Sequence, residues 1–156
     1  RGIVLSSPYI RPAEDLPYIK VLLSRAFGKV YPSLSIPANL KGEDLTSDPE
    51  KQREHRDDPD NLGSATAGWA KQCMEAQERV RAALDGGTAS LPVPVLFSYG
   101  TADVVANPET NREASESLKS EDKTVLRREG EMHEPLNEVK RQELFQLIAE
   151  WILERA

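Results

Sequence analysis

The sequence has few features of membrane-embedded or disulfide-stabilised proteins. Among its 156 residues there is one cysteine, Cys73, which has no second cysteine with which to form a disulfide or a paired metal site. A single thiol favours a reducing compartment. No apolar run approaches the roughly 20 residues of a membrane-spanning helix, and no charged segment followed by an apolar one resembles a secretory leader. We therefore expect a cytoplasmic protein.

An excess of basic charge is also missing. The chain carries 20 lysine and arginine residues against 26 aspartate and glutamate residues, which gives a net charge of -6. Because the basic residues are interspersed with acidic ones, no basic stripe can displace counterions from a phosphate backbone, and we expect no nucleic-acid partner. The composition is otherwise ordinary. The 38% hydrophobic and 29% charged residues are typical of a globular protein with a packed core.

The chain opens with a segment typical of a buried strand. Residues 2–8, Gly-Ile-Val-Leu-Ser-Ser-Pro, form a short apolar run that ends in proline. A buried parallel strand needs neighbours on both sides to satisfy its backbone groups. We therefore expect further sequence upstream. We divide the chain into a core strand at 1–8, a cap at 9–63 and the C-terminal part of the core at 64–156.

The segment 9–63 has a different character from its surroundings. It holds six prolines and several charge clusters, and its apolar residues occur in short patches. This pattern predicts short helices and no sheet. One helix is expected over 16–27, and another is expected after Asp48, where an N-cap residue precedes Pro49 at the first helical position.

The segment 64–156 alternates between helix and strand patterns. Apolar residues recur at intervals of three or four up to Leu84, and the glycine pair 86–87 ends that helix. Hydrophobic runs predict strands, and Asn107 followed by Pro108 is typical of a helix start. The last helix has one apolar stripe. This order predicts an α/β fold. Neighbouring parallel strands are expected at 3–5, 95–99 and 124–127, with further helices at 108–118 and around 144–152.

Two polar residues follow strands of the predicted sheet. Asp103 comes shortly after the strand at 95–99, and His133 comes shortly after the strand at 124–127. In open parallel sheets, ligands bind beyond the carboxyl ends of the strands. An imidazole is an effective base for a hydroxyl nucleophile when a carboxylate fixes its tautomer and stabilises the imidazolium. The order of acid before histidine is that of α/β-hydrolases, so we expect Asp103 to orient His133.

The residues around this pair resemble monoacylglycerol lipases. The resemblance is carried by Gly-Thr-Ala-Asp at 100–103, Ser-Glu-Asp-Lys-Thr at 120–124, Gly-Glu-Met-His-Glu at 130–134 and Asn-Glu at 137–138. It implies the C-terminal half of an α/β-hydrolase fold with a helical cap. It also implies a serine hydrolase without a cofactor that cleaves a monoacylglycerol into fatty acid and glycerol. The partner would be the lipid ester, and the cap would make a transient membrane-surface contact.

The nucleophile of such an enzyme is not recognisable in the sequence. The resemblance transfers roles to Asp103 and His133 alone, because no G-x-S-x-G motif occurs. Ser6 and Ser7 lie at a strand end but lack the glycine-flanked turn that exposes a nucleophile, so we expect them to line the site. The nucleophile and the oxyanion donors are expected in a missing N-terminal half, and this chain alone is expected to be inactive.

Several alternatives stay open. Taken singly, Asp103 fits a turn aspartate and His133 fits a loop histidine. Lysophospholipases, epoxide hydrolases and dehalogenases are other α/β-hydrolases that the two positions would suit. A non-catalytic binding module is a further alternative. A metal site formed by Asp103, His133 and Glu134 has enough ligands, but no H-E-x-x-H motif supports it.

The remaining chemically notable residues have structural interpretations. His55 is flanked by charged residues, which predicts a solvated face. Cys73 falls on the apolar stripe of its helix, where an unpaired thiol behaves as a small hydrophobe. Trp69 and Trp151 are expected to pack against the domain.

Overall fold

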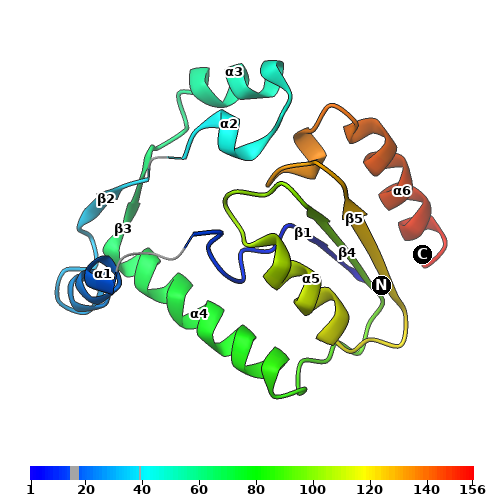
Figure 1. Cartoon of the computed structure of the whole chain (residues 1–156), viewed down its shortest axis with the longest axis horizontal. Helices are drawn as coiled ribbons and strands as arrows, with labels where there is room; N and C mark the ends of the chain where they lie inside the picture. The colour runs from blue at the N-terminus through cyan, green and yellow to red at the C-terminus, as the bar shows by residue number, and fades with distance from the viewer. Residues whose placement is uncertain (15–17, 39) are drawn as a thin grey trace.

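The computed structural model describes residues 1–14, 18–38 and 40–156. Its core is a parallel sheet in which β1 (Ile3–Ser6), β4 (Val95–Gly100) and β5 (Lys123–Arg128) follow one another in that order (Figure 1). Ile3 pairs with Val95, and Val95 pairs with Lys123. The predicted α/β fold and its neighbouring parallel strands are therefore confirmed.

The central strand β4 is buried along its whole length. Its sequence, Val-Leu-Phe-Ser-Tyr-Gly, is rich in the β-branched and aromatic residues that suit a strand covered on both faces. Phe97 and Tyr99 point to one face, where they pack with Ala114 of α5 (Pro108–Ser117). Leu84 of α4 (Ala67–Asp85) adds to the same cluster.

The opposite face of the sheet is covered by α6 (Arg141–Leu153). Trp151 is buried there against Gly2, where an added Cβ would lie 2.6 Å from the indole ring. Its Nε1–H donates to Thr124 Oγ1 at 3.1 Å. The predicted packing role of Trp151 is confirmed. By contrast, β1 is only half-buried, because among the described residues it has a strand neighbour, β4, on one side alone.

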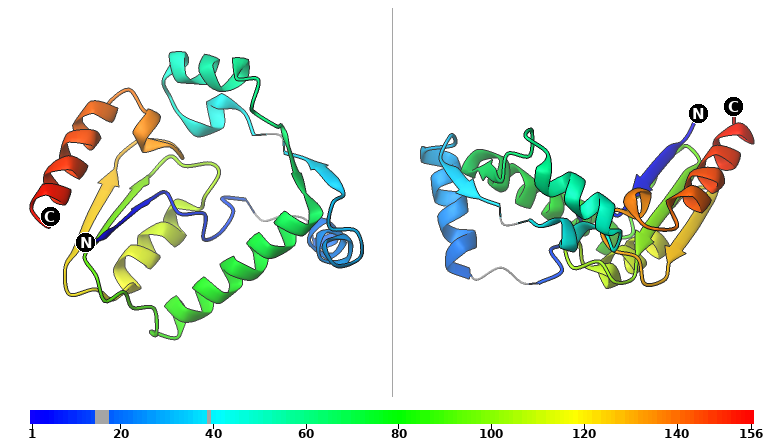
Figure 2. Two further views of the ribbon diagram at one scale, coloured as in Figure 1. Left: turned by 180° about the vertical axis from the view of Figure 1, so that it is seen from behind. Right: turned by 90° about the horizontal axis from the view of Figure 1, so that it is seen from above.

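The cap follows β1 and extends away from the sheet. It contains α1 (Tyr18–Val30), α2 (Gly42–Leu45) and α3 (Pro49–Asp57), and α1 packs against α4. Figure 2 shows α1 at the end of the molecule that is remote from both termini. The helix expected over 16–27 is present from Tyr18 onwards, whereas Leu16 lies outside the described residues. The expected N-cap residue of α3 is also present, since Asp48 Oδ1 accepts from the Glu50 N–H at 2.9 Å.

The prediction that the cap contains no sheet was wrong. β2 (Ser35–Pro37) pairs antiparallel with β3 (Ser64–Thr66), and Ile36 lies opposite Ala65. Each strand has three residues, which is too short for an alternating pattern to show in the sequence. Pro37 fits at this position because it ends an edge strand. The pair joins the chain segment before α2 to the one that follows α3.

The prediction for Trp69 was also wrong. Its side chain is 59% exposed at the start of α4, where it lines a cavity and does not pack into the core. Among the described helices, none is long and apolar enough to cross a membrane.

Candidate active site

The loops that follow β4 and β5 bring Asp103 and His133 into contact. Asp103 Oδ2 lies 2.9 Å from His133 Nδ1, although the two residues are 30 positions apart in sequence. The Asp103 side chain is fully buried, and that of His133 is 19% exposed. The predicted contact at the carboxyl edge of the sheet is therefore present, with the carboxylate inside and the imidazole facing outward.

The second oxygen of Asp103 fixes the carboxylate in place. Asp103 Oδ1 accepts from the backbone N–H groups of Val105 and Ala106, both at 2.8 Å. This leaves Oδ2 for the imidazole. Because an ionised carboxylate can only accept, the proton of a neutral imidazole belongs on Nδ1, and the lone pair belongs on Nε2 of His133. The arrangement suits a general base whose reactive atom is Nε2.

Two further hydrogen bonds join the loops to each other. The Ala102 N–H donates to the Glu131 carbonyl at 3.0 Å, and the Gly130 N–H donates to Thr101 Oγ1 at 2.9 Å. Gly130 has a φ of +75°, a left-handed conformation that favours glycine. Gly100 allows the close approach, since a Cβ there would lie 2.2 Å from the carbonyl oxygens of Glu131 and Met132.

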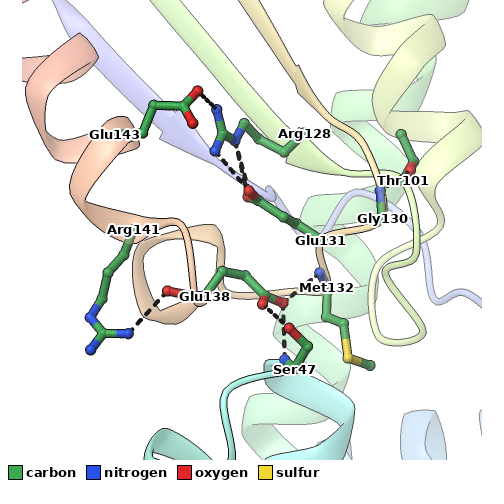
Figure 3. Close-up of polar contacts among 9 residues, drawn as sticks. All are labelled: Ser47, Thr101, Arg128, Gly130, Glu131, Met132, Glu138, Arg141 and Glu143. Atoms are coloured by element: carbon green, nitrogen blue, oxygen red, sulfur yellow. Dashed lines mark hydrogen bonds and ion pairs between the residues drawn. The ribbon is translucent and has the colours of Figure 1, made fainter.

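An ion-pair network supports the histidine loop from the side of α6. Arg128, the last residue of β5, donates from Nη2 to Glu131 Oε1 at 2.7 Å and from Nη1 to Glu143 Oε1 at 3.0 Å (Figure 3). The hydrogen bond to Glu131 raises the pKa of Arg128 above its usual range. Arg128 and Glu131 are nearly buried. This network anchors the start of the loop that carries His133.

The cap contacts the same loop from another direction. The Glu134 N–H donates to the Leu45 carbonyl at 2.8 Å, and Thr46 Oγ1 donates to the Asn137 carbonyl at 2.9 Å. Glu138 is 1% exposed and bonds both Ser47 and Met132. Sequence reasoning included Glu138 only as part of the resemblance and predicted no role for it. A buried glutamate in a polar stretch leaves no pattern by which it could be found.

The other residues considered from the sequence lie apart from this pair or are already engaged. His55 Nε2 lies 2.9 Å from Asn61 Nδ2, beside α3. Glu134 accepts from Asn137 Nδ2 at 2.6 Å. Within residues 1–14, 18–38 and 40–156, no three His, Cys, Asp or Glu side chains are grouped to hold a metal ion. Burial raises the pKa of the Cys73 thiol above its usual range, which disfavours the thiolate.

Ser7 directly follows Ser6, the last residue of β1, and its hydroxyl is enclosed. It adopts a left-handed φ of +39° and is 3% exposed. Its N–H donates to the Ser98 carbonyl at 2.8 Å, whereas its Oγ has no hydrogen-bond partner among the described residues. A substrate cannot reach a hydroxyl enclosed in this way.

A cavity of about 340 Å³ lies beside the acid loop, between α1, α4 and the segment that follows β1. Its wall includes Pro12, which forms a bridge with Ala106. The neighbouring Ala13 N–H donates to the Val105 carbonyl at 2.9 Å. The cavity wall is therefore joined to the turn that holds Asp103. Apolar and polar side chains share its surface, among them Ile10, Val21, Trp69, Met74 and Gln77.

The sequence profile of a known family matches most of the chain. The family described as "Serine aminopeptidase, S33" matches residues 1–140. The chain belongs to this family. A similar protein is an uncharacterized abhydrolase domain-containing protein of Dictyostelium discoideum, which is 25% identical over 155 residues. That alignment covers 99% of this chain and 16% of the relative.

Solved structures show the same fold. The monoacylglycerol lipase of Paleococcus ferrophilus superposes with a TM-score of 0.88 at 27% identity, covering 99% of this chain and 59% of the lipase. A soluble variant of monoglyceride lipase from Saccharomyces cerevisiae superposes with a TM-score of 0.85 at 18% identity, covering 99% of this chain and 56% of the lipase. This S33 family chain thus spans just over half the length of each lipase, and it has the α/β-hydrolase fold.

Proposed function

We propose that the full-length protein is a serine hydrolase that cleaves monoacylglycerols, with Asp103 and His133 as its acid and base. The observation that supports this most is the 2.9 Å contact between the Asp103 carboxylate and His133 Nδ1 at the carboxyl edge of the sheet. The similarity to the lipase of Paleococcus ferrophilus, at a TM-score of 0.88, supports the ester class. The nucleophilic serine would belong to a part of the protein that precedes β1.

The chemistry follows from the roles of the two side chains. His133 Nε2 takes the proton of the serine hydroxyl as the serine oxygen bonds to the ester carbonyl carbon. Asp103 stabilises the imidazolium that forms. The imidazolium then gives this proton to the glycerol oxygen as the carbon–oxygen bond of the ester breaks. Water repeats the cycle on the acyl-enzyme, which releases the fatty acid and restores the serine.

The cavity beside α1 and α4 would hold part of the acyl chain. It is joined to the acid loop through Pro12 and Ala106, and Ile10, Val21 and Met74 contribute apolar surface. A volume of about 340 Å³ lies within the range of small-molecule sites. The amphipathic lining suits a lipid with a polar head.

The outer face of α1 supports a transient contact of the cap with a lipid surface. Large apolar side chains are exposed there, and Val30 is the most exposed at 83%. Exposed apolar patches of this kind mark interaction sites more often than singly exposed residues do. Such a contact would bring the cavity close to the lipid that supplies the substrate. The exposed residues of α1 are Ile19, Leu22, Leu23, Phe27 and Val30.

The chain offers a matched pair of histidines for testing the proposal. His133→Ala in the full-length protein should lower kcat for a monoacylglycerol by at least about a thousandfold, because the general base is lost. His55→Ala, which changes the other of the two histidines, should leave kcat unchanged. Steady-state hydrolysis with purified variants measures both. Full activity of His133→Ala would refute the assignment.

A second measurement separates the rival classes. A fluorophosphonate probe should label one serine in the part that precedes β1, because it reacts with activated serine hydroxyls. An aspartate nucleophile, as in dehalogenases and epoxide hydrolases, would leave the protein unlabelled. Hydrolysis of an aminoacyl anilide without hydrolysis of the ester would overturn the monoacylglycerol assignment. A folded protein that neither reacts with the probe nor hydrolyses an ester would be a binding module.

A further inference from the structure

Glu138 is a buried carboxylate whose contacts join two separate parts of the molecule. Its Oε1 accepts from the Met132 N–H at 2.9 Å and from the Ser47 N–H at 3.1 Å, while its Oε2 accepts from the Ser47 hydroxyl. Figure 3 shows the side chain lying between the histidine loop and the cap. Three donors and no acceptors face the carboxylate in these contacts, which suits its ionised, acceptor-only form.

These bonds hold the main chain on one side of His133. Met132 directly precedes the histidine, so its N–H is one residue away from the imidazole-bearing Cα. On the other side, the Glu134 N–H donates to the Leu45 carbonyl at 2.8 Å. The cap segment 45–47 therefore reaches both neighbours of His133, directly through Leu45 and through the Glu138 side chain. This double attachment restrains the position and rotation of the histidine backbone.

The cap segment is itself fastened to α6. Arg141 Nη1 donates to Asp48 Oδ2 at 2.5 Å and to the Glu138 carbonyl at 3.1 Å. Asp48 follows Ser47 directly and caps α3. The anchor of Glu138 is thus a fixed piece of main chain, and a movement of the cap base would be transmitted to the histidine loop.

We propose that Glu138 is a positioning residue that couples the cap to His133 and keeps the imidazole in contact with Asp103. This rests on the proposed function only in its kinetic consequences. Glu138 contacts no reacting atom. It acts through the Met132 and Ser47 amides, and it should affect turnover more than substrate affinity.

The test uses full-length protein and three substitutions. Glu138→Met keeps the length of the side chain but accepts no strong hydrogen bond, so it should lower kcat about 10- to 100-fold, the effect of misplacing a catalytic group by about 1 Å. KM for a short-chain ester should stay within about twofold. Glu138→Gln should restore most of kcat, because its amide oxygen still accepts from both N–H groups. Glu138→Asp, which is too short to reach both, should fall between the two, and it replaces the Met variant if that variant does not fold.

A control variant separates positioning from general destabilisation. Thr124→Val removes the acceptor of the Trp151 indole near the start of β5, at the opposite end of that strand from the histidine loop. It should lower the melting temperature yet leave kcat unchanged. A kcat loss in Thr124→Val equal to that in Glu138→Met at matched stability would overturn the proposal. So would a Glu138→Met variant whose kcat stays within about twofold of wild type.

A spectroscopic readout does not depend on catalysis. The proton between His133 Nδ1 and Asp103 should give a low-field proton resonance in the wild-type protein. Glu138→Met should lose or broaden it, and Thr124→Val should keep it. If the wild-type protein hydrolyses no ester, the proposed function fails and this resonance alone decides. Its persistence in Glu138→Met would then overturn the positioning role.

Discussion

Gly100→Ala tests whether the site depends on the close approach between the end of β4 and the main chain of the histidine loop. Gly100 ends β4 and pairs with Arg128 at the end of β5. An alanine Cβ would lie 2.2 Å from the carbonyl oxygens of both Glu131 and Met132. Cβ atoms essentially never come closer than 3.0 Å to such an atom, so the histidine loop must retreat by at least about 0.8 Å. The obstructing atoms are main-chain oxygens, which cannot rotate away.

The displacement should separate the two members of the pair. Asp103 is held by the turn after β4, whereas His133 belongs to the displaced loop, so the 2.9 Å contact should lengthen beyond hydrogen-bond distance. A misplacement of about 1 Å costs on the order of a hundredfold in turnover. Overpacking of this kind destabilises a protein by about 1–3 kcal/mol. We therefore expect a stable fold with a much lower kcat.

The assay is a comparison with Gly86→Ala. Gly86 ends α4 with a φ of −77°, and an added Cβ there meets one atom at 3.0 Å, the Ala82 carbonyl oxygen. It should change neither kcat nor the urea midpoint appreciably. Steady-state hydrolysis and urea unfolding of full-length protein measure both variants. Wild-type turnover in Gly100→Ala would refute the reasoning, because it would mean that the loop can retreat without moving His133.

Two further predictions concern titratable groups. The hydrogen bond from Arg141 holds the pKa of Asp48 below its ordinary range. The ion pair therefore stabilises the fold above that ordinary range, and its contribution is lost as the pH falls through the lowered pKa. Asp48→Asn keeps the helix cap but should lower the free energy of unfolding in urea near neutral pH, with a gap that closes in acid. A gap independent of pH would contradict this. Because burial raises the pKa of Cys73, iodoacetamide should alkylate it more slowly at pH 8 than it alkylates glutathione, and equal rates would count against its burial.

The core strands were predictable because their signals are local. β4 is mostly apolar and aromatic, and its burial on both faces follows from its central place in the sheet. Asp103 and His133 could be paired from the sequence because parallel strands end at a common edge. The rule needs only the strand ends and the polar residues after them. It says nothing of how closely the loops approach, which depends on Gly100 and the turn at Gly130.

The features that sequence reasoning missed depend on contacts between distant segments. Ser47 and Glu138 are 91 residues apart, and neither lies in a periodic pattern. The cap strand β2 and its partner β3, which directly follows the cap, are each three residues long. Trp69 is large and aromatic, as many core residues are. Its place at the start of α4 nevertheless leaves its side chain lining a cavity. In each case, the structural role depends on residues that only the fold brings together, so the local sequence does not predict it.

The position of His133 is determined from three directions by elements that are distant in sequence. Asp103 holds the imidazole from the loop after β4, Arg128 and Glu131 anchor the loop towards α6, and the cap holds its other side through Glu138. These supports are hydrogen bonds and ion pairs, and the residues that form them all belong to this chain. The acid–base half of the proposed site is therefore built here, and a serine from a preceding part would need only to reach Nε2. Under the proposed function, this chain would supply the acid and the base together with their supports, and the preceding part would supply the nucleophile.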